Sequence, residues 1–587
     1  MKKKGLLITL ISTIVVVAVI GGLSIGKLFS SPEDPNAGPG SQVSNKVSNE
    51  GNNKGSKADP YYIYDTETFT TLLSTYGNQT KPYREAVMDP VMIDVVENGV
   101  TVSVQKKDEQ GNPVFEPRKD ENGYVVYKTV EGILEPYHFE LKNDIDFAGV
   151  DFKVLFNNNN AFTGVIDGKG FTVKNITINI TKENLEKNMF TKGDSTKSYA
   201  HIGIFGDMRD ASVKNINFDA VKIDIANDVY SYLQEGAFWD KYHTSLVELS
   251  IGSIAACVER TTIEANVNAT INADSYSVYE ENENQGRNCV GGIVGYAIDS
   301  KISSSNNTLS SIKIIADSGS KNYYIGGVAG YMFGSEFSNL KVSSEITASA
   351  IVKSQILSNK LWIGGVSGYM LNSTIEDSIV NLKVNQLVDE ERLTGTGVVK
   401  VNNGLYNMIG GIVSVIRANS AEQTSTISNV RVTSDVDMDA LFGGAVFEVK
   451  STYSEEEADA REAIFVKLED LVIKSTVKSL MAYGVASKLL YTDISYTEEF
   501  VCGSENNSIG EPTNYNIYLA GKTVLNTQAD QSMIVAGYVC TNTASPLVHV
   551  SLSDLKIMVS YENYSQLGLA DKARENLLGN LSYVAAA

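Results

Sequence analysis

The sequence predicts an all-β protein, a right-handed parallel β-helix in which strands wind into a solenoid of about ten coils. Small helical caps and an N-terminal transmembrane or signal helix complete the expected fold. Three observations lead to this fold class: a repeated glycine-rich phrase, a second repeated phrase built around Asn or Asp, and a drifting interval between repeats. The composition agrees, because many Gly (48), few Pro (11) and abundant β-branched residues favour strands joined by tight turns.

The glycine-rich phrase is clearest at residues 325–332 and 363–370, which read IGGVAGYM and IGGVSGYM. Glycine bends the chain or lets neighbouring backbone approach closely. A solenoid explains the repetition, because each coil meets the same neighbours above and below. Further copies are IGIFGD (202–207), IGSIAA (251–256), VGGIVGY (290–296), IGGIVS (409–414) and FGGAVF (442–447), with weaker echoes at 482–487 and 534–539.

The second phrase has the order apolar, any residue, Asn or Asp, apolar, any residue, apolar. Alternation of apolar and polar residues marks a strand with one buried face. Asn and Asp tolerate left-handed backbone angles, so we expect the central residue of each copy to form a corner. The corner residues of the six copies are Asn175, Asn215, Asn339, Asn429, Asp470 and Asp554.

The interval between repeats separates a solenoid from other repeat folds. Glycine phrases that start at residues 251, 290, 325, 363 and 409 are 39, 35, 38 and 46 residues apart. A strand solenoid tolerates this drift, because loops can leave one side while the wound core continues. The repeats also lack the 3.6-residue periodicity of helical repeats. We therefore expect Val213, Phe337 and Ile375 to share one interior.

The N-terminal residues predict export. Three lysines precede an uncharged run, residues 5–26, that is long enough to span a bilayer as a helix. We expect residues 1–29 to be a signal anchor, with a cleaved signal peptide as the alternative. Residues 30–60, rich in Ser, Asn and Gly, predict a disordered linker. The bulk of the protein is then extracellular, held at the cell membrane by a single pass, or secreted if the signal is cleaved.

The remaining domains are an N-terminal cap with a helix and hairpins (61–136), the β-helix (137–560) and a C-terminal helical cap or tail (561–587). Caps are expected because the last coil of a solenoid exposes unpaired strand edges. In the first cap, residues 64–78 predict a helix with Asp65 or Thr66 as N-cap and Gly77 as terminator. Its apolar face consists of Phe69, Leu72, Leu73 and Tyr76. Residues 91–105 predict a hairpin about Asn98 and Gly99.

Three tyrosines follow the last glycine of successive phrases: Tyr296, Tyr331 and Tyr369. We expect them to stack as a ladder on neighbouring coils. Two roles fit such a ladder: an aromatic strip that binds glycans, and structural stacking, which we favour because aromatic stacks stabilise strand arrays.

The alignment of the glycine phrases also indicates whether Cys257 and Cys289 can form a disulfide. Pairing Ile251 with Val290 places Cys257 seven positions along the strand from the counterpart of Cys289, beyond disulfide reach for an extended strand. We therefore expect no bond between them. Cys502 and Cys540 lie where the register is too weak to judge.

Several classes of function are disfavoured. The formal net charge of −21 argues against nucleic acid as a partner, since phosphate binding needs clustered Lys and Arg. Four scattered His and four Cys form no zinc pattern, so we expect no metal or cofactor. The densest carboxylates, Asp144, Asp146, Asp151 and Asp167, are typical of corners and turns rather than of calcium binding or catalysis.

The two phrases resemble the GLUG-motif repeats of bacterial surface and adhesin-like proteins. HFELKNDIDFAG (138–149) and AFTGVIDGKGFTVKNITI (161–178) match the usual entry to such repeats. The resemblance covers about residues 135–560 and is most specific in 138–218 and 290–384. It implies an extracellular parallel β-helix that serves as a stalk or binding module, and it implies no catalytic residues. Some relatives carry a metalloprotease domain, but this chain has no matching zinc motif.

We therefore expect a non-enzymatic cell-surface protein whose β-helix displays loops for adhesion to host or environmental glycans or matrix proteins. The alternatives are a carbohydrate-active β-helix enzyme, such as a polysaccharide lyase or hydrolase, and a passive surface spacer. The candidate ligand surface consists of Tyr296, Tyr331, Tyr369 and Trp239. The candidate binding loops are the longest insertions: 181–200, 226–250, 272–289, 385–408 and 448–466.

Overall fold

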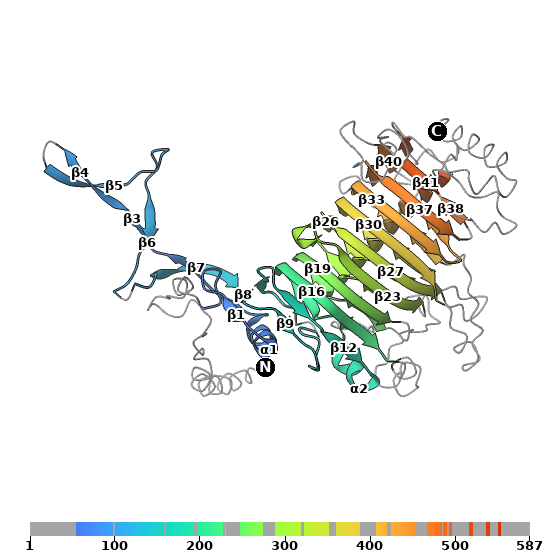
Figure 1. Cartoon of the computed structure of the whole chain (residues 1–587), viewed down its shortest axis with the longest axis horizontal. Helices are drawn as coiled ribbons and strands as arrows, with labels where there is room; N and C mark the ends of the chain where they lie inside the picture. The colour runs from blue at the N-terminus through green and yellow to red at the C-terminus, as the bar shows by residue number, and fades with distance from the viewer. Residues whose placement is uncertain are drawn as a thin grey trace, which may run out of the picture. The chain divides into compact units, whose positions relative to one another are not determined.

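The structure is a computed structural model of the chain, built mostly from β-strands with few helices (Figure 1). It describes residues 54–97, 100–121, 123–157, 160–191, 198–226, 229, 247–273, 288–318, 322–350, 360–387, 407–418, 424–451, 466–479, 481–483, 485–489, 492–495, 516–519, 536–539 and 550–552. The expected membrane segment (5–26) and the expected C-terminal cap (561–587) lie outside these residues. Within them, no helix is long and apolar enough to cross a membrane.

The chain divides into two compact units. The described part of the first is Arg84–Glu131, and the second contains Lys54–Tyr83 together with the chain from Gly132 onward. The region expected to be one N-terminal cap, 61–136, is therefore shared between the two units.

The first unit is made of antiparallel hairpins. Strand β3 (Met88–Pro90) pairs with β6 (Phe115–Pro117), and β4 (Met92–Glu97) pairs with β5 (Val100–Gln105). The β4–β5 pairing confirms the expected hairpin strands, although Asn98 and Gly99 themselves lie outside the described residues. Strands β2 (Thr80–Ala86) and β7 (Tyr127–Pro136) form a further two-stranded sheet where the chain passes between the two units.

The second unit contains three large sheets, which we call sheets 1, 2 and 3. Sheet 1 has nineteen strands among the described residues and is parallel throughout. Its strands are β1 (Tyr61–Ile63), β8 (His138–Leu141), β9 (Ile145–Asp146), β10 (Val165–Asp167), β11 (Thr172–Lys174), β12 (Thr177–Ile180), β16 (Ser212–Ile225), β19 (Thr262–Ala273), β22 (Lys301–Ser303), β23 (Ser310–Ser318), β26 (Glu336–Ser338), β27 (Lys341–Ala350), β30 (Thr374–Gln386), β33 (Ser425–Asp437), β36 (Val466–Glu469), β37 (Val472–Lys478), β40 (Thr492–Ser495), β41 (Asn516–Leu519) and β43 (Val550–Leu552).

Sheets 2 and 3 each have nine strands among the described residues. Sheet 2 consists of β13 (Met189–Thr191), β14 (Ser198–Ile202), β17 (Val247–Gly252), β20 (Asn288–Gly291), β24 (Asn322–Gly326), β28 (Lys360–Gly364), β31 (Asn407–Gly410), β34 (Leu441–Gly443) and β38 (Met481–Tyr483). Sheet 3 consists of β15 (Phe205–Arg209), β18 (Ala255–Glu259), β21 (Val294–Ile298), β25 (Ala329–Phe333), β29 (Ser367–Leu371), β32 (Val413–Ala418), β35 (Val446–Ser451), β39 (Ala486–Leu489) and β42 (Ala536–Val539). All pairings in both sheets are parallel except that of β13 with β14.

Each repeat thus supplies strands to sheets 1, 2 and 3 in turn, and the same position in successive repeats lies in register. One interior row of sheet 1 shows this directly: each residue is the Cα partner of the next, from Val213 through Ile263, Ile302, Phe337, Ile375 and Ile427 to Leu468. All seven side chains are buried in one hydrophobic cluster. The expectation that Val213, Phe337 and Ile375 share an interior is confirmed.

The glycine phrase marks the turn from sheet 2 into sheet 3. A Cβ on its first glycine would meet a carbonyl oxygen of its own repeat, at 1.9 Å for Gly326 and Ala329 O. A Cβ on its second glycine would meet the next repeat, at 2.2 Å for Gly327 and Gly365 O. Where the phrase has two glycines, both positions lie too close to backbone for a side chain. The two earlier copies have Ile204 and Ser253 at the second position and keep only the first glycine.

The Asn and Asp corners also match the expectation. Asn175, Asn215, Asn339, Asn429 and Asp470 all have φ between 49° and 59°, in the left-handed region. The sixth residue, Asp554, lies outside the described part of the chain. Asn and Asp adopt this conformation at less cost than other residues with a side chain. The side chains of Asn175, Asn215 and Asn429 donate to an aspartate of the neighbouring repeat.

Helix α1 (Thr66–Tyr76) precedes the repeats and packs on the same core. Asp65 is its N-cap, accepting a 2.8 Å hydrogen bond from the Thr68 backbone N–H, and Gly77 is its C-cap, as expected. Phe69, Leu72 and Leu73 are buried, and Tyr76 packs against the core cluster. The expected helix and its buried face are therefore confirmed, and its role as a cap stays a prediction. The three other helical segments described are shorter: α2 (Lys182–Leu185), η3 (Glu186–Asn188) and η4 (Ser305–Asn307).

Adding one methyl group to the glycine phrase tests this close packing. We expect Gly327→Ala to lower the free energy of unfolding by at least about 2 kcal/mol, because the new Cβ overlaps backbone that cannot rotate away. Equilibrium urea unfolding measures the change. The control is Ser311→Thr, which adds one carbon on the exposed face of sheet 1 and should change stability by less than about 0.5 kcal/mol. Equal effects from the two variants would contradict the packing argument.

Candidate functional site

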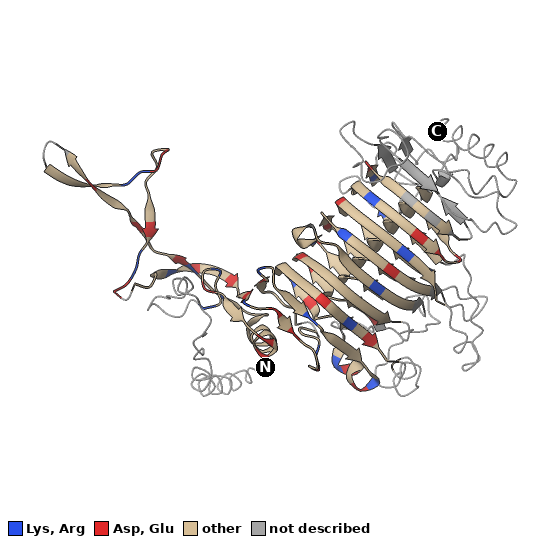
Figure 2. Cartoon of the chain, in the orientation of Figure 1, with Lys and Arg blue, Asp and Glu red and all other residues tan. Residues whose placement is uncertain are grey.

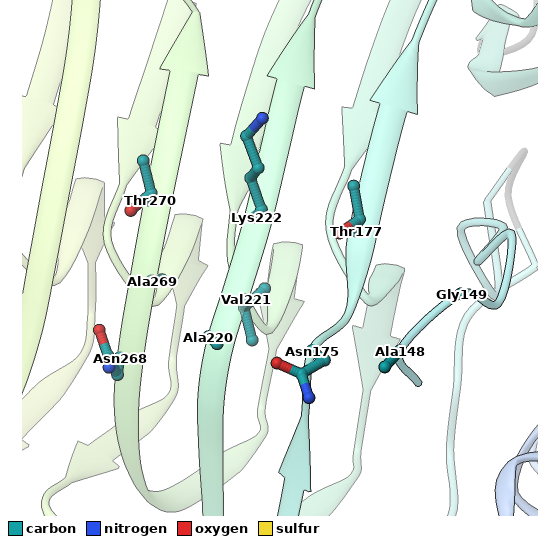
Figure 3. A pocket seen from close by; sticks show the side chains of 10 residues that line it. All are labelled: Ala148, Gly149, Asn175, Thr177, Ala220, Val221, Lys222, Asn268, Ala269 and Thr270. Atoms are coloured by element: carbon teal, nitrogen blue, oxygen red, sulfur yellow. The ribbon is translucent and has the colours of Figure 1, made fainter. Parts of the chain in front are cut away.

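A groove of about 500 Å³ lies on the outward face of sheet 1, near its N-terminal end (Figure 3). It crosses strands β12, β16 and β19 and reaches the turn after β9. One end is formed by Ala148 and Gly149, the two sides carry amide and hydroxyl groups, and the central strand β16 carries Ala220 and the Lys222 side chain between them (Figure 3). The lining residues are Ala148, Gly149, Asn175, Thr177, Ala220, Val221, Lys222, Asn268, Ala269 and Thr270.

A bulge in β16 forms the floor of this groove. The β16–β19 register shifts between the pairs Phe218–Val267 and Val221–Ala269, so β16 contains one more residue than β19 at this point. The extra length is taken up at Ala220, whose φ is 51°. A bulge re-aims the side chains around it, and alanine has no long side chain to fill the space. The sheet surface is therefore hollow here.

Side-chain hydrogen bonds fix the polar groups around the groove, and those of the two amides link neighbouring repeats. The Asn175 side chain donates from Nδ2 to Asp146 Oδ1 over 2.7 Å, and Asn268 donates in the same way to Asp219 Oδ1 over 2.8 Å. Lys222 Nζ donates to Asp224 Oδ2 over 2.9 Å. These contacts orient the two amides and the ammonium group before any ligand arrives.

The charges around the groove are mixed in sign. On sheet 1, Lys and Arg alternate with Asp and Glu among uncharged residues (Figure 2). Hydrogen bonds from Asn175 Nδ2 and the Ala148 backbone N–H, with Lys174 nearby, lower the pKa of Asp146. Asp146 is therefore an anion at neutral pH and a fixed acceptor for the Asn175 amide.

Of the carboxylates considered for calcium or catalysis, Asp144, Asp146 and Asp167 accept hydrogen bonds from neighbouring strands and turns. Asp144 Oδ1 accepts a 2.8 Å bond from the Thr172 N–H. Burial acts to raise the pKa of Asp167, but hydrogen bonds from the Lys169 N–H and Asn215 Nδ2 outweigh it, and this pKa is lowered overall. Across the described residues, no three His, Cys, Asp or Glu side chains gather as they would to hold a metal ion.

The tyrosine ladder forms as the register predicts. Tyr296, Tyr331 and Tyr369 are consecutive Cα partners in sheet 3. The ring centroids of the first two lie 4.7 Å apart, and those of the last two lie 4.4 Å apart, with nearly parallel planes. Tyr331 and Tyr369 are only 3% and 7% exposed, so their ring faces contact each other rather than solvent. Stacking is thus established, and a ligand role for the ladder stays a prediction.

The ladder belongs to a second apolar cluster, separate from the main core, where the outward faces of sheets 2 and 3 meet. Tyr324 of β24 packs edge-on against Tyr331 and Tyr369, and Trp362 of β28 is buried with them. At the equivalent corner of other repeats, Ser250 Oγ donates to Ala256 O over 2.7 Å and His201 Nδ1 lies 2.7 Å from Asp207 Oδ1. Residues six apart therefore touch across this corner.

This corner bears on the prediction that Cys257 and Cys289 do not form a disulfide. Cys257 and Cys289 are not in a disulfide, and Cys289 is the partner of Ser250, as the alignment predicts. The distance estimate assumed an extended strand, however, and the chain turns sharply between β17 and β18. The absence of the bond is confirmed, whereas the straight-strand reason for it is wrong.

The candidate loops fall mostly outside the described residues, as do Trp239, Cys502 and Cys540. The described strand ends show where the loops leave. Four of the five connect the end of a sheet 1 strand to the start of a sheet 2 strand, and 448–466 instead connects sheet 3 to sheet 1. The region 181–200 contains α2, η3 and β13, so it is partly regular structure rather than only loop.

The groove was not predicted from the sequence. It is formed around Ala220, an alanine in a left-handed conformation, and a single sequence gives no sign of that conformation. The spacing of Asn175 and Asn268 is visible only once β12 and β19 are placed on either side of β16. Comparisons with protein-family models and with curated proteins find no match to the chain.

A double-mutant cycle tests the ladder. We expect Tyr331→Leu and Tyr369→Leu each to lower the free energy of unfolding, with a coupling of about 0.5 to 1.5 kcal/mol from the lost ring stacking. Urea unfolding of the two single variants and the double variant gives this value. Tyr331 and Tyr61 provide the control pair, because Tyr61 stacks on Tyr76 instead, and their effects should add within about 0.5 kcal/mol. A coupling near zero for the ladder pair would show that the rings do not support each other.

Proposed function

We propose that the protein is an exported, non-enzymatic surface scaffold, a right-handed parallel β-helix that presents binding loops along one edge. Its ligands would be host or environmental glycans or matrix proteins. The N-terminal segment 5–26 would hold it at the cell membrane, with the bulk of the chain outside. The resemblance of its phrases to GLUG-motif repeats of bacterial surface proteins supports this assignment.

The order of the strands supports the β-helix. Successive repeats visit sheets 1, 2 and 3 in the same sequence, and every pairing between consecutive repeats is parallel and in register for the row from Val213 to Leu468. Parallel crossovers are right-handed in nearly all known cases, which favours a right-handed winding. Such a winding needs no closed domain per repeat, so it accommodates repeats of unequal length.

One observation carries the display function: long insertions leave the sheets without disturbing their register. Strand β27 ends at Ala350 and the next strand begins at Lys360, yet Tyr324 still pairs with Trp362 and Ile325 with Ile363. The same holds between Gln386 and Asn407. Because the ends of parallel strands align, the described strand ends from which successive insertions leave lie side by side. A row of variable segments on a rigid frame is typical of a binding surface.

The chemistry of the groove favours binding over bond cleavage. Its lining contains no carboxylate, whereas a glycosidase needs two that face the same bond. The nearby Asp146 and Asp167 accept hydrogen bonds within turns and between strands, and their pKa values are lowered, which is the wrong direction for a general acid. A carbohydrate-active enzyme is the second candidate, because parallel β-helices also host such enzymes.

The proposal is tested with the purified full chain on an array of glycans and matrix proteins. We expect binding to a restricted set of spots, and loss of at least about tenfold in signal when residues 389–405 are replaced by a short Gly-Ser linker. The matched control replaces residues 453–464, which leave a different edge. Both variants should keep the thermal unfolding midpoint of the parent, because neither replacement touches the paired strands.

The other outcomes separate the alternatives. Silence on every spot would favour a passive spacer and contradict the binding role. Release of reducing ends from polysaccharide substrates by the full chain would favour the enzyme. Equal binding by the parent and by variants in which each insertion is replaced in turn would place the binding surface outside the insertions and contradict the loop display.

A further inference from the structure

We infer that the groove across β12, β16 and β19 is a binding site for a short segment of a neutral oligosaccharide. This inference rests on the proposed function and names a ligand class and a location for it. The site is distinct from both the insertions and the tyrosine ladder, because its lining comes from the outward face of sheet 1.

The size and surface of the groove suit a sugar segment. Its volume of about 500 Å³ falls within the range of small-molecule sites in proteins. The floor offers the exposed methyl group of Ala220 and the backbone beside it, against which the C–H face of a sugar ring can pack, while the Val221 and Ala269 side chains point into the core. Polar groups stand at both sides, with Asn175 and Thr177 on one and Asn268 and Thr270 on the other (Figure 3).

The polar groups match hydroxyl groups in chemistry as well as in position. A sugar hydroxyl both donates and accepts, and so do an amide and a threonine hydroxyl. Asn175 and Asn268 commit their Nδ2 groups to Asp146 and Asp219, so each carbonyl Oδ1 is held in a fixed direction. In Figure 3 the Oδ1 of Asn175 points toward β16. Groups that are already ordered lose little entropy on binding.

The charges around the groove select against ionised sugars. The one cation in the lining, Lys222, is already paired with Asp224. Asp219 and Asp224 lie beside the lining, Asp146 lies at one end with Lys174 close to it, and the chain as a whole carries a formal charge of −21. An anionic glycan would meet this field without an unpaired cation in the lining to compensate. An uncharged sugar is not repelled by this negative field.

A peptide fits the groove less well. Strand β16 is hydrogen-bonded to β12 on one side and to β19 on the other. A peptide that adds as an extra strand needs an unpaired strand edge, and the centre of the groove offers none. The lining also contains no aromatic or deep apolar pocket for a side-chain anchor. Surface hydroxyls of a sugar need neither feature.

Calorimetric titration of the full chain with neutral trisaccharides tests the inference. The probes are cellotriose, maltotriose, mannotriose, xylotriose and chitotriose, with trigalacturonate as the acidic counterpart. We expect at least one neutral probe to bind and trigalacturonate not to bind. Thr270→Trp should fill the groove and weaken that affinity at least tenfold, and Asn175→Gly, which keeps the left-handed corner, should weaken it severalfold.

The matched control is Thr433→Trp, the same change on the exposed face of β33, and it should leave the affinity unchanged. Thermal unfolding checks that all three variants fold as the parent does. If no neutral probe binds, or if Thr270→Trp binds as tightly as the parent, the inference is overturned. If a probe no longer binds after loop replacement but still binds the Thr270→Trp variant, the groove is not its binding site, and the proposed scaffold function is unaffected. Tight binding of trigalacturonate that Thr270→Trp abolishes overturns the neutral class.

Discussion

The close approach of glycine backbones between repeats is the constraint on which the second unit depends. At Gly292, Gly327, Gly365 and Gly411 a Cβ would lie 2.0–2.2 Å from the carbonyl oxygen of the corresponding glycine one repeat later. In these four repeats the contact fixes where the chain turns from sheet 2 into sheet 3, and the two repeats before them have Ile204 and Ser253 at the same position. Once that turn is fixed, the interior row from Val213 to Leu468 and the tyrosine ladder follow, because both are consequences of the same register.

The outward-facing residues of the sheets are less uniform than the inward-facing ones. Inward-facing positions such as the row from Val213 to Leu468 carry an apolar side chain in every repeat, and this uniform interior stabilises the fold. The outward face carries hydrogen bonds such as that from Asn175 to Asp146, the apolar cluster that contains the tyrosine ladder, and the groove. Each of these occupies only part of the length of the sheets. A surface that varies over a constant interior suits a protein whose binding regions change while its frame does not.

The sequence predicts the features that recur. The corner conformation of Asn175, the stacking of Tyr331 on Tyr369 and the burial of Phe337 all follow from a phrase that appears several times. The left-handed Ala220 is different. It lies in register with the left-handed Asn175 of the preceding repeat, but alanine gives no sequence signal for this conformation, so the groove could not be foreseen. The contact between Ser250 and Ala256 was missed for another reason, since rise per residue along a strand says nothing about a sharp turn between two strands.

The central claim is that successive repeats lie directly over one another in a single register, and a cross-link measures this most directly. Ser311 of β23 and Ser343 of β27 are Cα partners on the outward face, within the separation that a disulfide spans. The account predicts that Ser311→Cys with Ser343→Cys oxidises to a disulfide detected by peptide mass spectrometry. Ser311→Cys with Glu345→Cys, two residues out of register, should not. Equal cross-linking of both pairs, or cross-linking of the second pair alone, would contradict the stacking on which the fold and its proposed function rest.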